Sequence, residues 1–450
     1  MTDGATRDAP GTDLRFSGAL PHVAHVALAR PAFKGDAAAA VRRSRAGLEQ
    51  AAAQLGFVLT VPSGGAERHP RNDAPFSPGV VTDVPEAQRV AAALSADPPD
   101  LLLLEHATFA TGELIAPLVA AAPRVAVWAL PESGPGTGPL PQNALCGLQM
   151  TLSLFDTPQF GRRGEPVRWF HGEVHEQRFA APFARTIAAL RAVRALEQAT
   201  VVQIGGTAPG FYALEEAPAA LHGVRVVDRS LGELFGAISE VPDEEAHARA
   251  EAAREGHDVE VDEGTLLRAA RIEGALERLA DEVGAQALAG GPAILMDLSD
   301  IDEAADALLL WHCGNAPAAW ADPDGARPRL TTHFNRDDVG PVRDQPLRPG
   351  PSSALRLLDG GRTALVAGGS FVGAKREGFD GVRGWWTAPS WAGRRLPARR
   401  FLAELLEQRV PHHLALAQGD HQAVLAEACF WLGIEVRPVE PRPFAIEADA

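Results

Sequence analysis

The feature that most constrains this chain is a series of short apolar runs that alternate with helical segments between residues 22 and 130. Residues 100–105 read DLLLLE, a continuously apolar run of the kind found in parallel strands that are buried on both faces. The alternation predicts a doubly wound α/β domain, whose ligands bind beyond the carboxyl ends of the strands. His106 and Glu132 follow two of these strands and are secondary candidates for the site of a neighbouring subunit. The alternative is that they serve structural packing.

The remainder of the chain predicts further domains, because 450 residues exceed what one hydrophobic core organises. Residues 166–290 again alternate strand and helix patterns, which predicts a second α/β domain. From residue 291 short apolar runs lie between Gly and Pro turns, which indicates an antiparallel β-rich domain. We therefore expect domains at 17–165, 166–290 and 291–450, preceded by a disordered tail over residues 1–16.

Charge and composition exclude several kinds of partner. The formal net charge of −16 argues against nucleic acid and anionic membranes, which would repel the chain. No apolar run approaches the ~20 residues of a membrane span, and the polar first residues do not resemble a signal peptide. The three cysteines, Cys146, Cys313 and Cys429, are widely spaced and predict no disulfide framework. We expect a cytoplasmic protein with no nucleic-acid or membrane partner.

Candidate metal ligands stand at the ends of apolar runs. Asp297 ends one run and His312 ends the next, while the doublet His412-His413 opens a strand about a hundred residues later. A carboxylate and imidazoles from separate elements suit a divalent transition metal with positions left open for substrate oxygens. The alternative is structural, since a buried aspartate also caps turns and a lone histidine is commonly a satisfied core or surface residue.

Five motifs in fixed order sharpen this choice. Together they resemble the family of L-fucose isomerase and L-arabinose isomerase, in particular its fucose-isomerase-like branch, from about residue 22 to residue 436. The motifs are NALCGLQM at 143–150, VVQIGGTAPGF at 201–211, MDLSDID at 296–302, LLWHCGNAP at 309–317 and VPHHLALAQGDH at 410–421.

The resemblance implies a fold and an activity. The fold would be two Rossmann-like doubly wound α/β domains followed by a C-terminal antiparallel β-rich, barrel-like domain. The activity would be a metal-dependent aldose–ketose isomerisation of a pentose, a 6-deoxyhexose or a related sugar through a cis-enediol. The cofactor would be Mn²⁺ or another divalent cation, and the chain would form a homo-oligomer, a trimer or a hexamer, with active sites near subunit interfaces.

The resemblance also implies roles for individual residues. Asp297 would be a metal ligand as well as an acid/base group, and His413 would be the late metal-binding histidine, with His412 as the alternative. His312 matches an active-site histidine. Further candidates for sugar contact, which sequence alone does not separate from packing residues, are Gln142, Asn143, His333 and Trp386.

The chain departs from the family at the second catalytic carboxylate. Relatives carry it in a Cys-Glu-Gly-Asp motif upstream of the position of Asp297, and no such motif occurs here. Either Glu273, which Gly274 follows, takes the role, or the segment that holds the glutamate is deleted near residues 290–291. We favour the deletion, because residues 265–288 have the pattern of an amphipathic surface helix. The protein would then be a catalytically impaired relative that retains sugar or metal binding.

Overall fold

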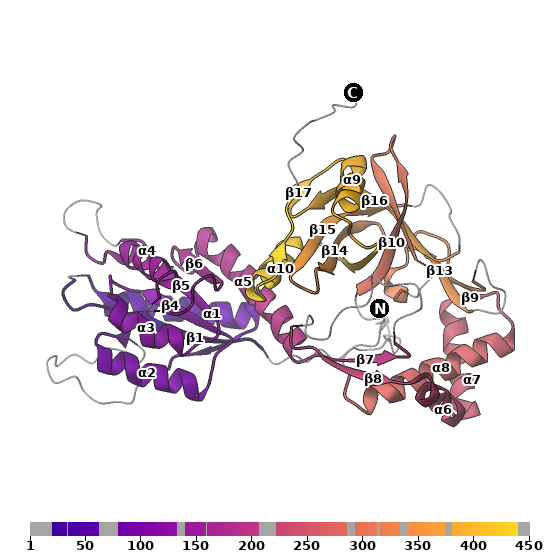
Figure 1. Cartoon of the computed structure of the whole chain (residues 1–450), viewed down its shortest axis with the longest axis horizontal. Helices are drawn as coiled ribbons and strands as arrows, with labels where there is room; N and C mark the ends of the chain where they lie inside the picture. The colour runs from indigo at the N-terminus through magenta and orange to yellow at the C-terminus, as the bar shows by residue number, and fades with distance from the viewer. Residues whose placement is uncertain are drawn as a thin grey trace, which may run out of the picture. The chain divides into compact units, whose positions relative to one another are not determined.

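The computed structural model describes residues 20–33, 35–62, 80–132, 140–158, 160–206, 222–285, 293–312, 316–333, 340–373 and 380–439. The chain divides into two compact units (Figure 1). The N-terminal unit consists of Gly18–Arg194 with Phe430–Gly433, and the C-terminal unit consists chiefly of Ala195–Cys429. The predicted tail over residues 1–16 and the expected junction at 290–291 lie outside the described residues.

The N-terminal unit is built on a parallel sheet with strand order β2-β1-β4-β5-β6, while β3 also pairs with β1. Every pairing in this sheet is parallel, as predicted. Its strands are β1 (His22–Leu28), β2 (Val58–Thr60), β3 (Val80–Val81), β4 (Leu101–His106), β5 (Val125–Ala129) and β6 (Val167–His171). Its helices are α1 (Ala37–Leu55), α2 (Val84–Ala96), α3 (Gly112–Ala120), α4 (Ala144–Phe155) and α5 (Gln177–Glu197).

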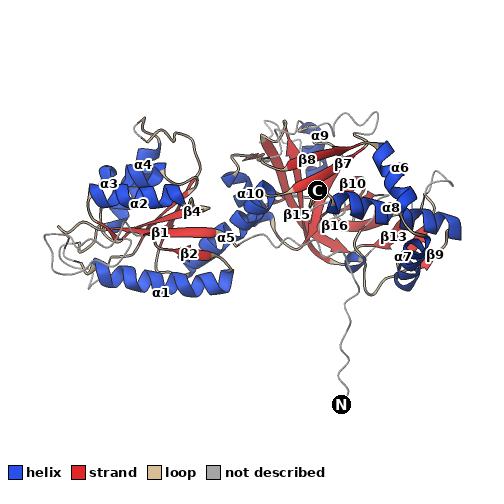
Figure 2. Cartoon of the chain, turned by 90° about the horizontal axis from the view of Figure 1, so that it is seen from below, coloured by secondary structure: helices blue, strands red, loops and turns tan. Residues whose placement is uncertain are grey.

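Helices cover both faces of this sheet, which explains the continuous apolar runs. Figure 2 shows α1 on one side of the sheet and α2, α3 and α4 on the other. All six residues of β4 are buried, as a strand packed on both faces requires. Local signals fix the helix ends: the Asp36 side chain accepts a hydrogen bond from the amide of Ala39 at the start of α1, and Gly56, at φ 69°, ends it.

The N-terminal unit extends further along the chain than expected. We expected residues 166–290 to begin a second domain, but β6 pairs in parallel with β5 and is the edge strand of the first sheet. Aromatic packing holds this edge, since the ring of Phe170 lies 5.6 Å from that of Phe183 on α5 and meets it edge-on. The boundary therefore falls near Arg194 instead of residue 165.

The second doubly wound domain is not found among the described residues. Residues 195–285 contribute a two-stranded parallel sheet of β7 (Thr200–Ile204) and β8 (Arg225–Arg229). The helices that follow pack on one another and on Leu330, instead of covering two faces of a sheet. These helices are α6 (Leu231–Glu240), α7 (Asp243–Gly256) and α8 (Glu263–Asp281). The short strand β9 (Asp258–Val259) pairs with β12 (Arg329–Thr331) of the C-terminal sheet.

The C-terminal sheet closes into a ring. Six of its strands pair in the order β15-β14-β18-β10-β11-β16 and the last pairs back with the first, all antiparallel. The strands are β10 (Ala293–Asp302), β11 (Ala307–His312), β12 (Arg329–Thr331), β13 (Val342–Pro346), β14 (Gly350–Leu358), β15 (Thr363–Val372), β16 (Val382–Trp391), β17 (Arg394–Arg395), β18 (His413–Gln418) and β19 (Glu435–Val436). The short helix η3 (Ala318–Trp320) and the helices α9 (Ala398–Glu407) and α10 (Gln422–Trp431) accompany them. The antiparallel strands that the sequence predicts are therefore present, and they form a closed ring.

A hydrophobic core lies on one face of the barrel strands and includes residues of α9. Trp386 and Phe401 are both fully buried, with ring centroids 5.5 Å apart in an edge-on arrangement. Met296 of β10 and Leu414 of β18 belong to this core and form a cross-strand pair. Within the described residues, no helix combines the length and the apolar character that crossing a membrane requires.

Candidate metal centre

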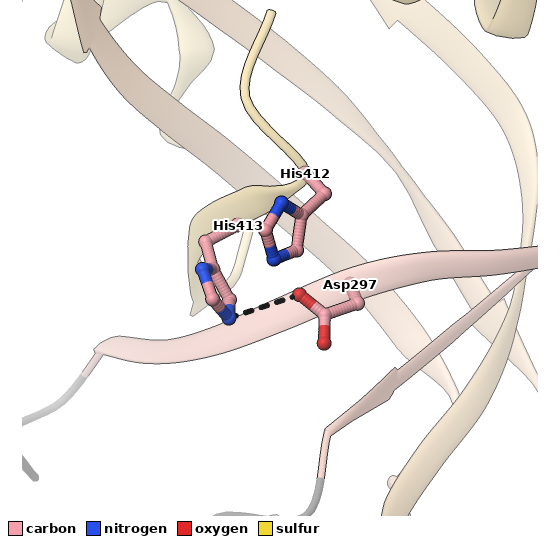
Figure 3. Close-up of side chains that lie close together, drawn as sticks. All are labelled: Asp297, His412 and His413. Atoms are coloured by element: carbon pink, nitrogen blue, oxygen red, sulfur yellow. Dashed lines mark ion pairs between the residues drawn. The ribbon is translucent and has the colours of Figure 1, made fainter. Parts of the chain in front are cut away.

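The candidate site is built on a directly opposed pair of residues, Asp297 of β10 and His413 of β18. Opposed residues of antiparallel strands point to the same face, and successive residues point to opposite faces. Because their neighbours Met296 and Leu414 point into the hydrophobic core, Asp297 and His413 face away from it. His413 Nε2 lies 3.2 Å from Asp297 Oδ1, and the two side chains are only 10% and 22% exposed (Figure 3).

His412 joins this pair from the segment that precedes β18. Its ring lies beside that of His413, with centroids 4.1 Å apart and planes tilted by 39°. Both rings lie next to the Asp297 carboxylate in Figure 3. One ligand atom from each of Asp297, His412 and His413 lies within 4.8 Å of the other two. Within the described part of the chain, no second group of three such residues is found.

His312 stands at the rim of the same cluster, at the last position of β11. Its ring centroid is 5.4 Å from that of His413. Burial lowers the pKa of His312; the Asp297 carboxylate opposes this shift and His412 adds to it. Burial also lowers the pKa of His413, again against the pull of Asp297. Both imidazoles are therefore held neutral near pH 7, the form whose lone pair accepts a proton or binds a metal.

The donor set fits a divalent metal. Asp297 Oδ1 is buried and accepts no hydrogen bond from the described residues, although His413 Nε2 faces it. Leaving a buried carboxylate oxygen without a hydrogen bond is costly, and a bound cation would remove that cost. At ligand–metal distances of about 2.1 Å, neighbouring ligand atoms lie about 3 Å apart. The Asp297–His413 separation already meets this requirement.

Glu273 is not brought into this cluster. It lies on α8 and is exposed; its carboxylate is 3.8 Å from the guanidinium of Arg249 on α7. The buried side of α8 is formed by other residues, including Leu266, Ala270 and Leu279. This arrangement agrees with the expected amphipathic surface helix, on which Glu273 is one of several charges. Among the residues that the structure describes, the cluster therefore contains a single carboxylate, that of Asp297.

The predicted sugar contacts belong to both units, and each is described within its own unit. Trp386 is fully buried in the barrel core and its indole nitrogen donates to the Ser352 hydroxyl at 2.8 Å, so its position is that of a core residue. Gln142 is buried in the N-terminal unit, where its side-chain amide donates to the Ala107 carbonyl at 3.3 Å. Asn143 precedes α4 in the same unit, at a positive φ of 53°. His333 is half-buried and follows β12 in the C-terminal unit.

His106 and Glu132, the secondary candidates, have structural partners. His106 is fully buried and its Nε2 lies 2.8 Å from the Thr151 hydroxyl of α4. Burial lowers the pKa of His106 to about 4. Glu132 accepts a hydrogen bond from the backbone amide of Gln142 at 3.0 Å. His106 therefore contacts α4 directly, and Glu132 holds the segment that leads into α4.

The sequence interpretation missed two polar features. In the N-terminal unit, His25 and Glu105 are fully buried on neighbouring strands, 2.7 Å apart, and the Ser44 hydroxyl donates to the same carboxylate at 2.9 Å. In the C-terminal unit, Arg356 of β14 contributes positive charge at His413. No motif marks Arg356; its charge acts on His413 because β14 pairs with β18.

Comparisons with known proteins support a sugar isomerase. The sulfoquinovose isomerases of Priestia aryabhattai and Priestia megaterium are each 24% identical over 422 residues, covering 80% of this chain and 90% of theirs. The sulfoquinovose isomerase of Alkalicoccus urumqiensis is 24% identical over 381 residues, covering 72% of this chain and 82% of its own. No family model matches. The chain is thus related, at a distance, to sugar isomerases.

The aligned region contains more residues in these relatives than in this chain. Since 80% of 450 residues is about 360, an alignment of 422 residues includes about 60 positions at which this chain has no residue. The alignment with the Alkalicoccus protein has a similar excess, because 72% of 450 is about 324 against 381. The relatives therefore contain residues, within the aligned region, that have no counterpart here.

Proposed function

We propose that this chain is a metal-dependent aldose–ketose isomerase. The observation that carries the proposal is the Asp297–His413 pair, an acid and an imidazole on opposed strands with His412 and His312 at the same rim. The relationship to sulfoquinovose isomerases supports the reaction class. Sulfoquinovose, a glucose with a sulfonate at C6, is the first substrate to test. Assembly into a trimer or hexamer stays a prediction.

The reaction needs a proton to move between C1 and C2 of the open-chain sugar. A divalent metal bound at the cluster would stabilise the negative charge that develops on the two neighbouring sugar oxygens. Asp297 and His413 hold the metal position, and burial keeps the His312 imidazole neutral. His312 then accepts the C2 proton of the aldose and returns it to C1 of the cis-enediol, while the O2 proton passes to O1. Atoms and charge balance without a further reactant.

An isomerisation assay tests this proposal. The full chain, freed of metal by a chelator, is incubated with Mn²⁺, Co²⁺ or Zn²⁺ and with sulfoquinovose, L-fucose or L-arabinose. Incorporation of deuterium from D₂O at the product carbon reports the proton transfer. Turnover of at least one sugar is expected, with a loss of about 10²–10⁴-fold in His312→Gln. Absence of turnover and of exchange with every metal and sugar would refute the proposal.

A second candidate is a relative that binds metal and sugar but turns over poorly. Two observations favour it. The described part of the cluster holds a single carboxylate, and about 60 positions in the alignment of 422 residues have no residue in this chain. Loss of one acid/base group costs about 10²–10⁴-fold in rate. Metal binding without turnover or exchange in the same assay would establish this candidate over the first.

A further inference from the structure

The adjacent histidines His412 and His413 both face Asp297, which a regular strand does not permit. Successive residues of a strand point to opposite faces, so only one of two neighbours reaches a given site. Here β18 begins at His413, and His412 lies at a bend in the preceding segment, just after Pro411. Because His412 lies outside the strand, its side chain does not follow this alternation, and its ring lies beside that of His413 (Figure 3).

We propose that His412 and His413 bind the metal together with Asp297, so that two imidazoles and one carboxylate form the ligand set that the described residues supply. The proposal rests on the metal site of the proposed function and deepens it. It differs from a site in which Asp297, a second carboxylate and one histidine of the doublet hold the metal, because His412 fills the third ligand position. Glu273 does not fill that position, since it faces Arg249 on α7.

The replacement changes the charge of the centre. A divalent cation bound by two carboxylates and one neutral histidine has no net charge, whereas one carboxylate and two neutral histidines leave a net charge of +1. The exposure of His412 keeps one side of the centre open to solvent and to a ligand oxygen. A cationic, open centre binds anionic oxygen donors more strongly than a neutral one does.

The replacement also changes the preferred metal. Imidazole nitrogens favour Fe²⁺, Co²⁺ and Zn²⁺, whereas Mn²⁺ and Mg²⁺ favour oxygen ligands. Two histidines with one carboxylate form the set that commonly holds such metals with open positions. We therefore expect Co²⁺ and Zn²⁺ to bind much more tightly than Mn²⁺, although the resemblance pointed to manganese.

The test counts histidine ligands directly. The full chain is stripped of metal and titrated with Co²⁺, Zn²⁺ and Mn²⁺ by calorimetry, and X-ray absorption of the Co²⁺ form counts imidazole ligands. Two imidazoles are expected. His412→Ala and His413→Ala should each weaken Co²⁺ binding at least tenfold, since even residues that only orient metal ligands contribute 10–100-fold. The exposed His247→Ala, on α7 of the same unit, is the matched control and should bind as wild type does.

Specific outcomes overturn the inference. A single imidazole in the absorption spectrum refutes it, as does wild-type Co²⁺ affinity in His412→Ala. His412→Gln serves as a second variant, and circular dichroism shows that both variants fold. If Co²⁺ binds through two imidazoles but no sugar is isomerised, the proposed function fails and the ligand set stands. If sugars are isomerised and His412 variants bind metal normally, the ligand set fails and the proposed function stands.

Discussion

His106 should make this protein less stable as the pH falls below 6.5. It is fully buried at the end of β4, and burial lowers its pKa from 6.5 to about 4. Between these two values the unfolded chain binds a proton at His106 that the folded chain does not bind. The free energy of unfolding therefore decreases on acidification through this window and is unaffected by His106 above it.

The magnitude follows from the width of the window. A shift of one pKa unit corresponds to about 1.4 kcal/mol, so the shift from 6.5 to about 4 corresponds to about 3 kcal/mol in total. By pH 5 the loss attributable to His106 is about 2 kcal/mol. No correction for solvent screening is needed, because the side chain is 0% exposed.

Urea unfolding at matched pH values between 7.5 and 5 measures this loss. His106→Gln keeps a polar group near the Thr151 hydroxyl but does not titrate, so its stability should decrease by about 2 kcal/mol less than that of wild type over the range. The exposed His175→Gln serves as the control and should follow the wild-type curve. Parallel curves for wild type and His106→Gln would refute the reasoning.

Three further predictions concern the C-terminal unit. A Cβ at Gly369 would lie 2.6 Å from Cε2 of Trp386, so Gly369→Ala should lower the free energy of unfolding by about 1–3 kcal/mol. Gly373 has open space around it, so Gly373→Ala is the control and should not lower this free energy. Equal thermal melting of the two variants would contradict the close packing at Gly369. Trp386→Phe leaves the Ser352 hydroxyl without its indole donor, so the free energy of unfolding in urea should fall by about 1–3 kcal/mol while KM stays unchanged. A raised KM with unchanged stability would instead identify Trp386 as a sugar contact. Glu273→Gln should leave Co²⁺ affinity and turnover unchanged, and a fall in turnover of about 10²-fold would identify it as the missing acid/base group.

The candidate site shows what a local sequence pattern can predict and what it cannot. Asp297 and His312 stand at the ends of apolar runs, and that placement alone predicted polar groups at the rim of a buried scaffold. The distance between Asp297 and His413 could not be predicted from the residues, because it depends on the register between β10 and β18, which are more than a hundred positions apart. Whether His412 or His413 faces Asp297 was left open by sequence, and the bend before β18 places both rings there.

The sequence by itself determined the element types, the parallel sheet around β4 and the antiparallel β-rich region after residue 291. Hydrophobic period and turn residues encode these features within a few residues of each position. Only the tertiary structure decided that β6 completes the first sheet, that Trp386 fills the barrel core and that Glu273 pairs with Arg249. These facts depend on strand order, ring closure and helix packing between distant segments, and periodicity along the chain does not carry that information.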